Sequence, residues 1–360
     1  MADPMVFPHN PAMPSPMPKP FSASIIKKAV EFLQAGELVA LPTETVYGLG
    51  ADAANPEAVA KIFAAKGRPA NHPLIVHLAS ATSLTQWAKD VPQAAWDLAA
   101  TFWPGPLTLI LKKQPWVPLA VTGGQNTVGL RVPAHPLTLE LLVAFAAAKV
   151  PGAAGIAAPS ANRFGRVSPT AAAHVREELG DKVSLVLDGG SCEVGIESTI
   201  VNFSRGVPEI LRLGAIGPDD IARVAGVSTV SDVGEGAEIP VPRVSGSLAV
   251  HYAPFTPLRL VGSNALAEEV VRFARAGRRV AVLAYDTCAP LETGLVFRWQ
   301  TMAPEPVAYA RDLYANLRAL DALGAEVILV EKVPPGSAWQ AIADRLSRAA
   351  AGSEAGIGIY

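Results

Sequence analysis

Residues 24–50 read SIIKKAVEFLQAGELVALPTETVYGLG. Apolar residues recur at helical spacing over Ile25–Gln34, and the apolar run Leu38–Leu41 has the character of a short strand. The same succession returns with a helical pattern over Glu57–Ala65 and a strand pattern over Leu74–Leu78. Short strands that alternate with helices are typical of α/β folds, in which helices cover a sheet, and we expect that architecture here.

The chain up to residue 214 continues this alternation and then departs from it. A helix is predicted over Thr170–Leu179, because Ser168 and Pro169 form a good helix start. The further strand patterns are Leu107–Leu111, Val128–Val132, Gly155–Ala158, Leu185–Leu187, Thr199–Asn202 and Ile210–Arg212. Several late strands follow one another with no helix between them, so some pairs must be antiparallel and the sheet mixed.

A change of composition divides the chain, whose 360 residues are about twice the usual domain length. Gly, Pro, Ser and acidic residues crowd into 227–257 without periodicity, as in a linker. Beyond it the patterns resume and predict a smaller open α/β domain, Rossmann-like, over 258–360, although it has no Gly-x-Gly-x-x-Gly turn. Residues 1–20 are rich in proline and predict a disordered leader, which leaves 21–226 as the first domain.

The composition also narrows the class of protein. Half of the residues are hydrophobic, 17% are charged and the formal net charge is -2, so no basic field supports nonspecific nucleic-acid binding as the main activity. Cys192 and Cys288 form neither a disulfide framework nor a metal-ligand cluster and fit a reducing compartment. The most apolar helical stretch, 137–150, is interrupted by polar residues and too short to cross a bilayer. We therefore expect a cytoplasmic protein without a membrane role.

Polar side chains follow the strand that ends at Leu41. Thr43, Thr45 and Tyr47 supply hydroxyls beside glycine backbone, and the ends of strands in α/β sheets are where ligands bind. This segment is therefore a candidate binding site, and the alternative is an ordinary exit from a strand into a turn.

Two cations follow the helix that ends near residue 65. Pro69 and Pro73 hold the next segment extended, so we expect Lys66 and Arg68 to project from an irregular loop on either side of Gly67. Such a pair suits a polyanion such as a triphosphate, since arginine binds oxygens bidentately and lysine adds a point charge. The alternative is a solvated helix C-terminus, which the helix dipole favours.

Further polar side chains stand at later strands. Ser160 and Asn162 follow a strand of small residues and can both donate and accept, which suits a ribose, a base edge or a phosphate. Arg131 and Arg212 lie inside apolar strands, where each must find an anion or a structural salt bridge. His77 stands near the end of an apolar strand, where a histidine is ordinarily a satisfied core residue.

Seven segments of the first domain, taken together and in order, are far more specific than any one of them. They are PTETVYGL (42–49), KGR (66–68), NHPLIVH (71–77), WPGPLT (103–108), VGLRVP (128–133), APSAN (158–162) and ESTIV (197–201). In content and order they resemble the YrdC-type threonylcarbamoyl-AMP synthases from about Ser22 to Gly214. Val250–Pro254 and the α/β tail resemble the extra C-terminal domain of the longer members of that family.

The resemblance implies a fold and the residues of two binding sites. The implied fold is a twisted mixed sheet with surrounding helices around a concave basic cavity. On the threonine side the implied residues are Thr45, His77, Arg131, the backbone near Ala158, and Ser198. On the ATP side they are Lys66, Arg68, His72, Thr127, Ser160, Asn162, Ser168 and Arg212, with Lys66 and Arg68 as the catalytic residues.

The resemblance also implies a reaction, in which L-threonine, bicarbonate or CO2, and ATP give threonylcarbamoyl-AMP and pyrophosphate for threonylcarbamoyladenosine formation in tRNA. The carbamate of threonine attacks the α-phosphate in line, so positioning and charge neutralisation matter more than a protein nucleophile. The sequence shows no acidic cluster that requires a metal, and we expect Mg2+ to arrive with the nucleotide. Downstream tRNA threonylcarbamoyl-transfer proteins are implied partners, and contact with tRNA itself is expected to be weak or indirect.

Two other functions use the same residues. An RNA-binding module would bind tRNA or double-stranded RNA through these cations, with steep salt dependence and no ATP turnover. A carbamoyl-transfer domain acting on carbamoyl phosphate would work beside zinc-finger and acylphosphatase-like segments, which this sequence does not show.

The linker carries a prediction of its own. Its last part, Arg243–Pro254, mixes glycine with apolar and aromatic residues that can dock, so we expect residues 227–257 to form a lid over the cavity. A lid would exclude water from an anhydride that hydrolyses readily. The alternative is that Tyr252 and its neighbours pack the two domains together.

Overall fold

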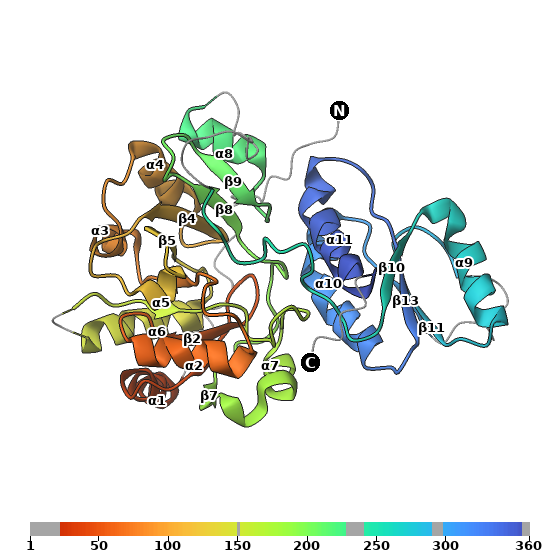
Figure 1. Cartoon of the computed structure of the whole chain (residues 1–360), viewed down its shortest axis with the longest axis horizontal. Coiled ribbons are helices and arrows are strands. Elements are labelled where there is room, and N and C mark those ends of the chain that lie inside the picture. The colour runs from red at the N-terminus through yellow and green to blue at the C-terminus, as the bar shows by residue number, and fades with distance from the viewer. Residues whose placement is uncertain (1–21, 150–151, 228–240, 290–297, 355–360) are drawn as a thin grey trace.

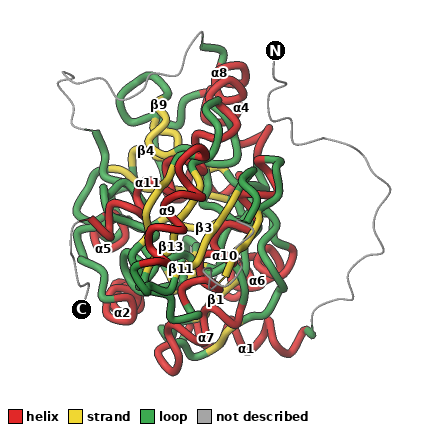
Figure 2. The backbone as a smooth tube through the Cα atoms, turned by 90° about the vertical axis from the view of Figure 1, so that its right-hand side faces the viewer, coloured by secondary structure: helices red, strands yellow, loops and turns green. Residues whose placement is uncertain are grey.

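The computed structural model describes residues 22–149, 152–227, 241–289 and 298–354. It contains two sheets in two bodies that lie side by side (Figure 1). Seen along the line that joins the two bodies, the strands lie toward the centre of the molecule and helices lie around them (Figure 2). The expected α/β class, with a mixed sheet and a second smaller sheet, is confirmed. The predicted leader, residues 1–20, lies outside the described residues.

The first sheet is mixed. Its strands are β1 (Val39–Leu41), β2 (Gly48–Asp52), β3 (Ile75–His77), β4 (Leu107–Lys112), β5 (Thr127–Arg131), β6 (Ile156–Ala157), β7 (Leu185–Val186), β8 (Thr199–Asn202) and β9 (Glu209–Arg212). Within the described ranges they form one sheet in the order β7-β1-β2-β6-β3-β5-β4-β8-β9. The pairs β1 with β7, β3 with β5, and β4 with β8 are parallel. The remaining neighbours are antiparallel. Among them β8 and β9 follow one another without a helix, as expected, and the sheet is mixed.

Helices surround this sheet, and one cavity residue, Arg68, directly follows α2. They are α1 (Ala23–Gln34), α2 (Pro56–Lys66), α3 (Leu84–Trp87), α4 (Gln93–Phe102), α5 (Leu119–Thr122), α6 (Pro136–Ala148), α7 (Ala172–Leu179) and α8 (Pro218–Ala225), with the 3-10 turns η1 (Ala81–Ser83) and η2 (Gly180–Lys182). Asn55 caps the N-terminus of α2, because its side chain accepts hydrogen bonds from two backbone N–H groups of the first turn. Pro56 is the first residue of the helix, a position that proline favours. It ends at Gly67, whose φ of 63° turns the chain so that Arg68 points back toward the sheet.

Strand β2 is not among the strands that the sequence predicts. The chain reverses after β1 because the Thr43 hydroxyl accepts from the backbone N–H groups of Thr45 and Val46, both at 3.2 Å. A Cβ atom at Gly50 would lie 2.8 Å from the Leu41 side chain, so only glycine allows β2 to approach β1 this closely. The glycines of the motif therefore belong to a buried strand, and the hydroxyls that precede them stand at its entrance.

The second sheet is parallel throughout the residues described. Its elements are β10 (Leu258–Val261), α9 (Ser263–Arg275), β11 (Val280–Ala284), β12 (Arg298–Thr301), α10 (Pro306–Asp321), β13 (Val327–Glu331), η4 (Ser337–Trp339) and α11 (Gln340–Glu354), and the strand order is β10-β13-β11-β12. Alternate residues of β11 face opposite layers, because Val280 and Val282 pack with α9 whereas Ala281 and Leu283 pack with α10 and α11. None of the described helices combines the length and the apolarity needed to span a bilayer.

The second body packs on the first through α10 and α11, which face it, while α9 lies on the far side (Figure 1). One apolar cluster joins Val46 and Ile196 of the first body to Tyr314 of α10 and Leu346 of α11. Tyr252 belongs to the same cluster and comes from the predicted linker, which the structure describes from residue 241 onward. The contact between the two bodies thus includes the segment 196–198, which directly precedes β8.

Candidate active site

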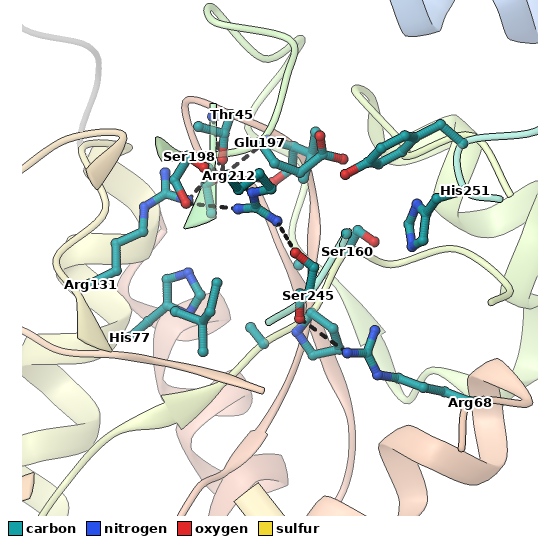
Figure 3. Close-up of a pocket in the computed structure, with 18 residues that line it drawn as sticks. Thr45, Arg68, His77, Arg131, Ser160, Glu197, Ser198, Arg212, Ser245 and His251 are labelled. Carbon is teal, nitrogen blue, oxygen red and sulfur yellow. Dashed lines mark hydrogen bonds between the residues drawn. The ribbon is translucent and has the colours of Figure 1, made fainter. Parts of the chain in front are cut away.

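A partly open cavity lies at the ends of the strands of the first sheet. Figure 3 shows Arg131 and Arg68 reaching into it from opposite sides, with Arg212 between them. The lining side chains come from the β1–β2 turn, the segment after α2, strands β3 and β5, the segments after β6 and before β8, strand β9, and the linker. They include Thr43, Thr45, Val46, Arg68, His77, Arg131, Ser160, Glu197, Ser198, Arg212, Ser245, His251 and Tyr252.

Arg131 is fixed at one end of the cavity by a partner on each of its three guanidinium nitrogens. Its guanidinium donates to a Glu44 carboxylate oxygen at 2.6 Å, to the Thr45 hydroxyl at 3.0 Å and to the Gly105 carbonyl at 3.2 Å. The other Glu44 oxygen accepts from the backbone N–H of Ala134 at 3.0 Å. This pair is buried and hydrogen-bonded on both sides, so the cation is held in one orientation and its charge is balanced.

Arg212 connects the centre of the cavity to the linker. It donates to both the carbonyl and the hydroxyl of Ser198 at 3.0 Å, and to the carbonyl of Ser245 at 2.9 Å. The Ser198 hydroxyl also shares a hydrogen bond of 2.8 Å with the Thr108 hydroxyl. Burial lowers the pKa of Arg212, because water no longer stabilises the charged form.

Arg68 occupies the opposite end and is 7% exposed. It donates to the Pro73 carbonyl and to the Ser245 hydroxyl, each at 3.0 Å, and its Nε has no partner in the described structure. Burial lowers the pKa of Arg68 to about 10. Among the residues described here neither Arg68 nor Arg212 forms an ion pair, so this end of the cavity carries unbalanced positive charge.

The expectation that Lys66 and Arg68 project from a polar loop is wrong for Lys66. Lys66 is the last residue of α2 and is 3% exposed, and its ammonium group donates to the carbonyls of Ser160 and Asn162. Burial and then the charge of Arg68 lower its pKa well below the ordinary value. The solvated helix C-terminus is excluded as well, because both side chains point inward from the turn at Gly67.

Two buried histidines flank the cavity. Burial lowers the pKa of His77 to about 3, with a further contribution from Arg131, and burial does the same for His251. Each has a ring Nδ1 without a partner among the described residues, so His77 is not the satisfied core histidine of the alternative interpretation. Both rings are therefore neutral at neutral pH and can donate or accept one hydrogen bond from a ligand.

The structure brings eight of the predicted site residues to the cavity wall, namely Thr45, Arg68, His77, Arg131, Ala158, Ser160, Ser198 and Arg212. The other five are not on the cavity wall. Lys66 donates to the backbone of Ser160 and Asn162, Ser168 donates to Glu197, Thr127 lines an adjoining hollow with Ser245, and the ring centroid of His72 lies 5.3 Å from that of Phe164. The Asn162 amide donates to two backbone carbonyls, and its oxygen has no partner in the described structure.

Several residues that line the cavity or hold its lining residues are not among those the sequence predicts. Glu44 and Glu197 flank predicted residues in the chain, yet no local pattern marks them, because Arg131 and Arg345, their partners, lie 87 and 148 positions away. Ser245 comes from the linker, and its position between Arg68 and Arg212 depends on how the linker folds back.

Comparisons with known proteins cover both bodies. The family model described as telomere recombination matches residues 31–214, and the model described as threonylcarbamoyl-AMP synthase, C-terminal domain, matches 216–351. The curated threonylcarbamoyl-AMP synthase of Pyrococcus abyssi is 38% identical over 330 residues, which cover 90% of this chain and 93% of that protein. The one of Bacillus subtilis is 38% identical over 330 residues, covering 91% and 93%.

A solved structure shares the whole architecture. The crystal structure of Pyrococcus abyssi Sua5 complexed with L-threonine superposes with a TM-score of 0.81 at 36% identity, over 91% of this chain and 94% of that one. The similarity extends across both sheets, so the two-body arrangement is that of a known protein and not a feature of this chain alone.

Proposed function

This chain belongs to the threonylcarbamoyl-AMP synthase family, and we propose that it makes threonylcarbamoyl-AMP and pyrophosphate from ATP, L-threonine and bicarbonate or CO2. The observation that carries the proposal is the division of one cavity into an end with a charge-balanced arginine and an end with two unbalanced arginines. An amino acid and a polyphosphate need those two environments. The chain is accordingly an enzyme of the nucleotidyltransferase type.

The end around Arg131 is proposed to hold threonine. A carboxylate can add to the guanidinium face that points into the cavity, while Glu44 keeps that face oriented. The hydroxyls of Thr45 and Ser198 and the neutral ring of His77 offer partners for the amino acid's other polar groups, and the backbone near Ala158 closes the pocket. The support is geometric, together with the fact that the similar Pyrococcus abyssi Sua5 structure is complexed with L-threonine.

The end around Arg68 and Arg212 is proposed to hold the triphosphate. Both cations are desolvated and lack an anionic partner in the described structure, so phosphate oxygens would satisfy them. Lys66 is proposed to act here through the backbone of Ser160 and Asn162, which it holds in place, as well as through its charge. The roles of His72, Thr127 and Ser168 toward ATP remain part of the same proposal.

The chemistry then needs no protein nucleophile. A carbamate oxygen of bound threonine attacks the α-phosphate, the bond to the β-phosphate oxygen breaks, and pyrophosphate carries away the electron pair of that bond. Arg68 and Arg212 balance the charge that collects on the leaving phosphates, and Arg131 keeps the attacking molecule aligned. In the described residues His, Cys, Asp and Glu do not gather in groups of three that could hold a metal, so we propose that Mg2+ is carried by the nucleotide.

The linker is proposed to be a lid over this cavity. Ser245 bridges Arg68 and Arg212 from the linker side, which supports the lid, whereas Tyr252 stacks on Tyr314 at a ring distance of 5.7 Å, which supports the packing alternative. Measuring how fast a protease cuts the linker distinguishes the lid from the packing role. A lid predicts that nicking between Ser245 and Tyr252 slows when ATP and threonine are both bound, and equal nicking rates with and without ligands would leave the packing role alone.

The product is proposed to pass to tRNA threonylcarbamoyl-transfer proteins in the cytoplasm, with weak or indirect contact to tRNA. An RNA-binding module is the less favoured function, because Arg68, Arg131 and Arg212 lie inside a cavity where a nucleic-acid backbone does not reach. A small anion fits that position better.

The decisive assay is pyrophosphate release from ATP, with threonine and bicarbonate each omitted in turn and valine offered in place of threonine. Release should require both co-substrates. Valine should be weaker than threonine by at least about a hundredfold, because hydroxyl partners would be left unpaired. Release that ignores threonine, or valine that works as well, contradicts the proposal.

A further inference from the structure

One buried carboxylate in the cavity wall receives its partners from both bodies. Glu197 accepts from the Ser168 hydroxyl at 2.6 Å within its own body. Its other oxygen accepts from the Tyr314 hydroxyl at 3.0 Å and from Arg345 Nε at 3.3 Å, which belong to α10 and α11. The two strongest donors to this oxygen therefore come from the second body.

Arg345 is the point where three parts of the chain meet. It is 1% exposed and donates to the backbone carbonyls of Leu213 and Glu197 as well as to the Glu197 carboxylate. Its guanidinium also lies over the ring of Tyr252, 5.7 Å from the centroid, so it touches the linker. A fully buried arginine is rare unless it is paired. Here each of the three guanidinium nitrogens donates to the first body, and one of them also pairs with Asp344 of α11 at 3.4 Å.

The position of Glu197 makes its charge important for the cavity. It lines the cavity and directly precedes Ser198, which anchors Arg212 through its carbonyl and its hydroxyl. Burial raises the pKa of Glu197, but Arg345, Arg212 and the Ser168 hydroxyl together lower it below the ordinary value. The carboxylate is thus ionised and lies within electrostatic reach of two arginines, one behind the cavity wall and one inside the cavity.

We propose that Arg345 is a positioning residue for nucleotide binding, which balances Glu197 from behind so that Arg212 stays available to the phosphates. Without Arg345 the Glu197 carboxylate would be buried without its cation. It would then draw Arg212 to itself and present negative charge to the triphosphate. The inference rests on the proposed function, and it gives the second body a task in the reaction, namely to neutralise the wall of a cavity that the first body builds.

The test compares four variants of the full chain. Arg345→Met removes the cation, Arg345→Lys keeps a cation, and Glu197→Gln with Arg345→Met removes both charges while leaving an amide that can still accept from Ser168. Arg272→Gln is the matched control, because Arg272 pairs with Glu269 on the exposed face of α9 in the same body. Equilibrium binding of ATP and of threonine is measured separately by calorimetry, together with thermal unfolding.

Arg345→Met is expected to weaken ATP binding by at least about tenfold and threonine binding by less than about twofold. Arg345→Lys and the double variant should recover most of the ATP affinity, and Arg272→Gln should match the wild type. A role confined to holding the two bodies together would instead lower the unfolding temperature, affect both ligands alike and leave the double variant no better than Arg345→Met.

The inference is overturned if Arg345→Met binds ATP like the wild type, or if the double variant shows no recovery. If Arg345→Met does not fold, the double variant decides, since it buries no unpaired carboxylate. Near wild-type ATP affinity supports the inference, and affinity at least about tenfold weaker overturns it. A wild-type protein that binds ATP without releasing pyrophosphate contradicts the proposed function and leaves this test intact.

Discussion

The two ends of the cavity hold arginines in opposite ways. Arg131 is bound to Glu44 at 2.6 Å and has every nitrogen satisfied, whereas Arg68 and Arg212 donate to hydroxyl and carbonyl groups and have no carboxylate within ion-pair distance in the described structure. One end is therefore a neutral, fixed recognition surface. The other end carries an excess of positive charge, which a bound anion would balance. The difference teaches that buried cations serve distinct purposes according to what pairs with them.

The largest effect is expected from breaking the balanced end. Arg131→Met leaves the Glu44 carboxylate buried without its cation and should lower the free energy of unfolding by about 3–5 kcal/mol. Urea unfolding measures this loss. Glu44→Gln with Arg131→Met removes both charges and should restore most of the stability. A loss below about 1 kcal/mol in the single variant would show that the pair does not hold this end together.

The unbalanced end should respond in ligand affinity and not in stability. Arg68→Met leaves no buried charge behind, because both hydrogen-bond partners of Arg68 are neutral. The Pro73 carbonyl also keeps a donor, the Ser245 hydroxyl at 3.1 Å. ATP binding should weaken by about ten- to a hundredfold, or roughly 1.5–3 kcal/mol, with unfolding nearly unchanged. Calorimetric titration with ATP measures this, and Arg223→Met, which removes an exposed arginine from α8, is the control. Unchanged ATP affinity would assign Arg68 a purely structural role.

Lys66 belongs to the same end but differs from Arg68 in what it holds. Lys66→Met removes the donor to two carbonyls near Ser160 and Asn162, so it should weaken ATP use and also cost about 1–3 kcal/mol of stability. Comparing the two variants thus separates loss of a positive charge at the ATP site from loss of hydrogen bonds that stabilise the fold. Urea unfolding of both variants, side by side, measures the separation. Equal free energies of unfolding in Lys66→Met and Arg68→Met would mean that the hydrogen bonds from Lys66 to the two carbonyls do not stabilise the fold.

The effect that is smallest near neutral pH, and that grows in acid, comes from two histidines, one at each end of the cavity. His77 and His251 have pKa values of about 3 in the fold, below the ordinary value of 6.5, so the folded state favours the neutral ring. The stability they contribute is fully present above pH 6.5 and is lost as the pH falls toward 3, by up to about 1.4 kcal/mol per pH unit for each ring. Asparagine at either position should flatten the decline of the unfolding free energy below pH 6.5. An unchanged slope in both variants would contradict the burial of these rings as the cause.

The sequence predicts those parts of the site that stand at the ends of apolar strands. Arg131, Arg212 and Ser198 lie where the strand patterns place them, at β5, β9 and the entrance to β8. The burial of Lys66 escapes such reasoning, since a lysine at the end of a helix is ordinarily solvated and only the tertiary fold covers it. The β2 strand is missed for a similar reason, because its glycines resemble a turn until a neighbouring strand is present.

Local sequence patterns do not predict which carboxylates pair with the buried arginines of the site. Glu44 pairs with Arg131 and Glu197 pairs with Arg345. Both arginines come from distant segments of the chain, and Arg345 comes from the other body. The order of motifs along the chain identifies the family without revealing these pairs. The boundaries of the predicted linker at 227 and 257 remain predictions, since residues 228–240 lie outside the described structure.

A crystal structure with threonine and a non-hydrolysable ATP analogue bound together tests the account most directly. It should show the threonine carboxylate bound to Arg131. The phosphates should lie between Arg68 and Arg212, close to Ser245 of the linker. Phosphates bound at Arg131, or a nucleotide that leaves both Arg68 and Arg212 without an anionic partner, would contradict the division of the cavity into a balanced and an unbalanced end.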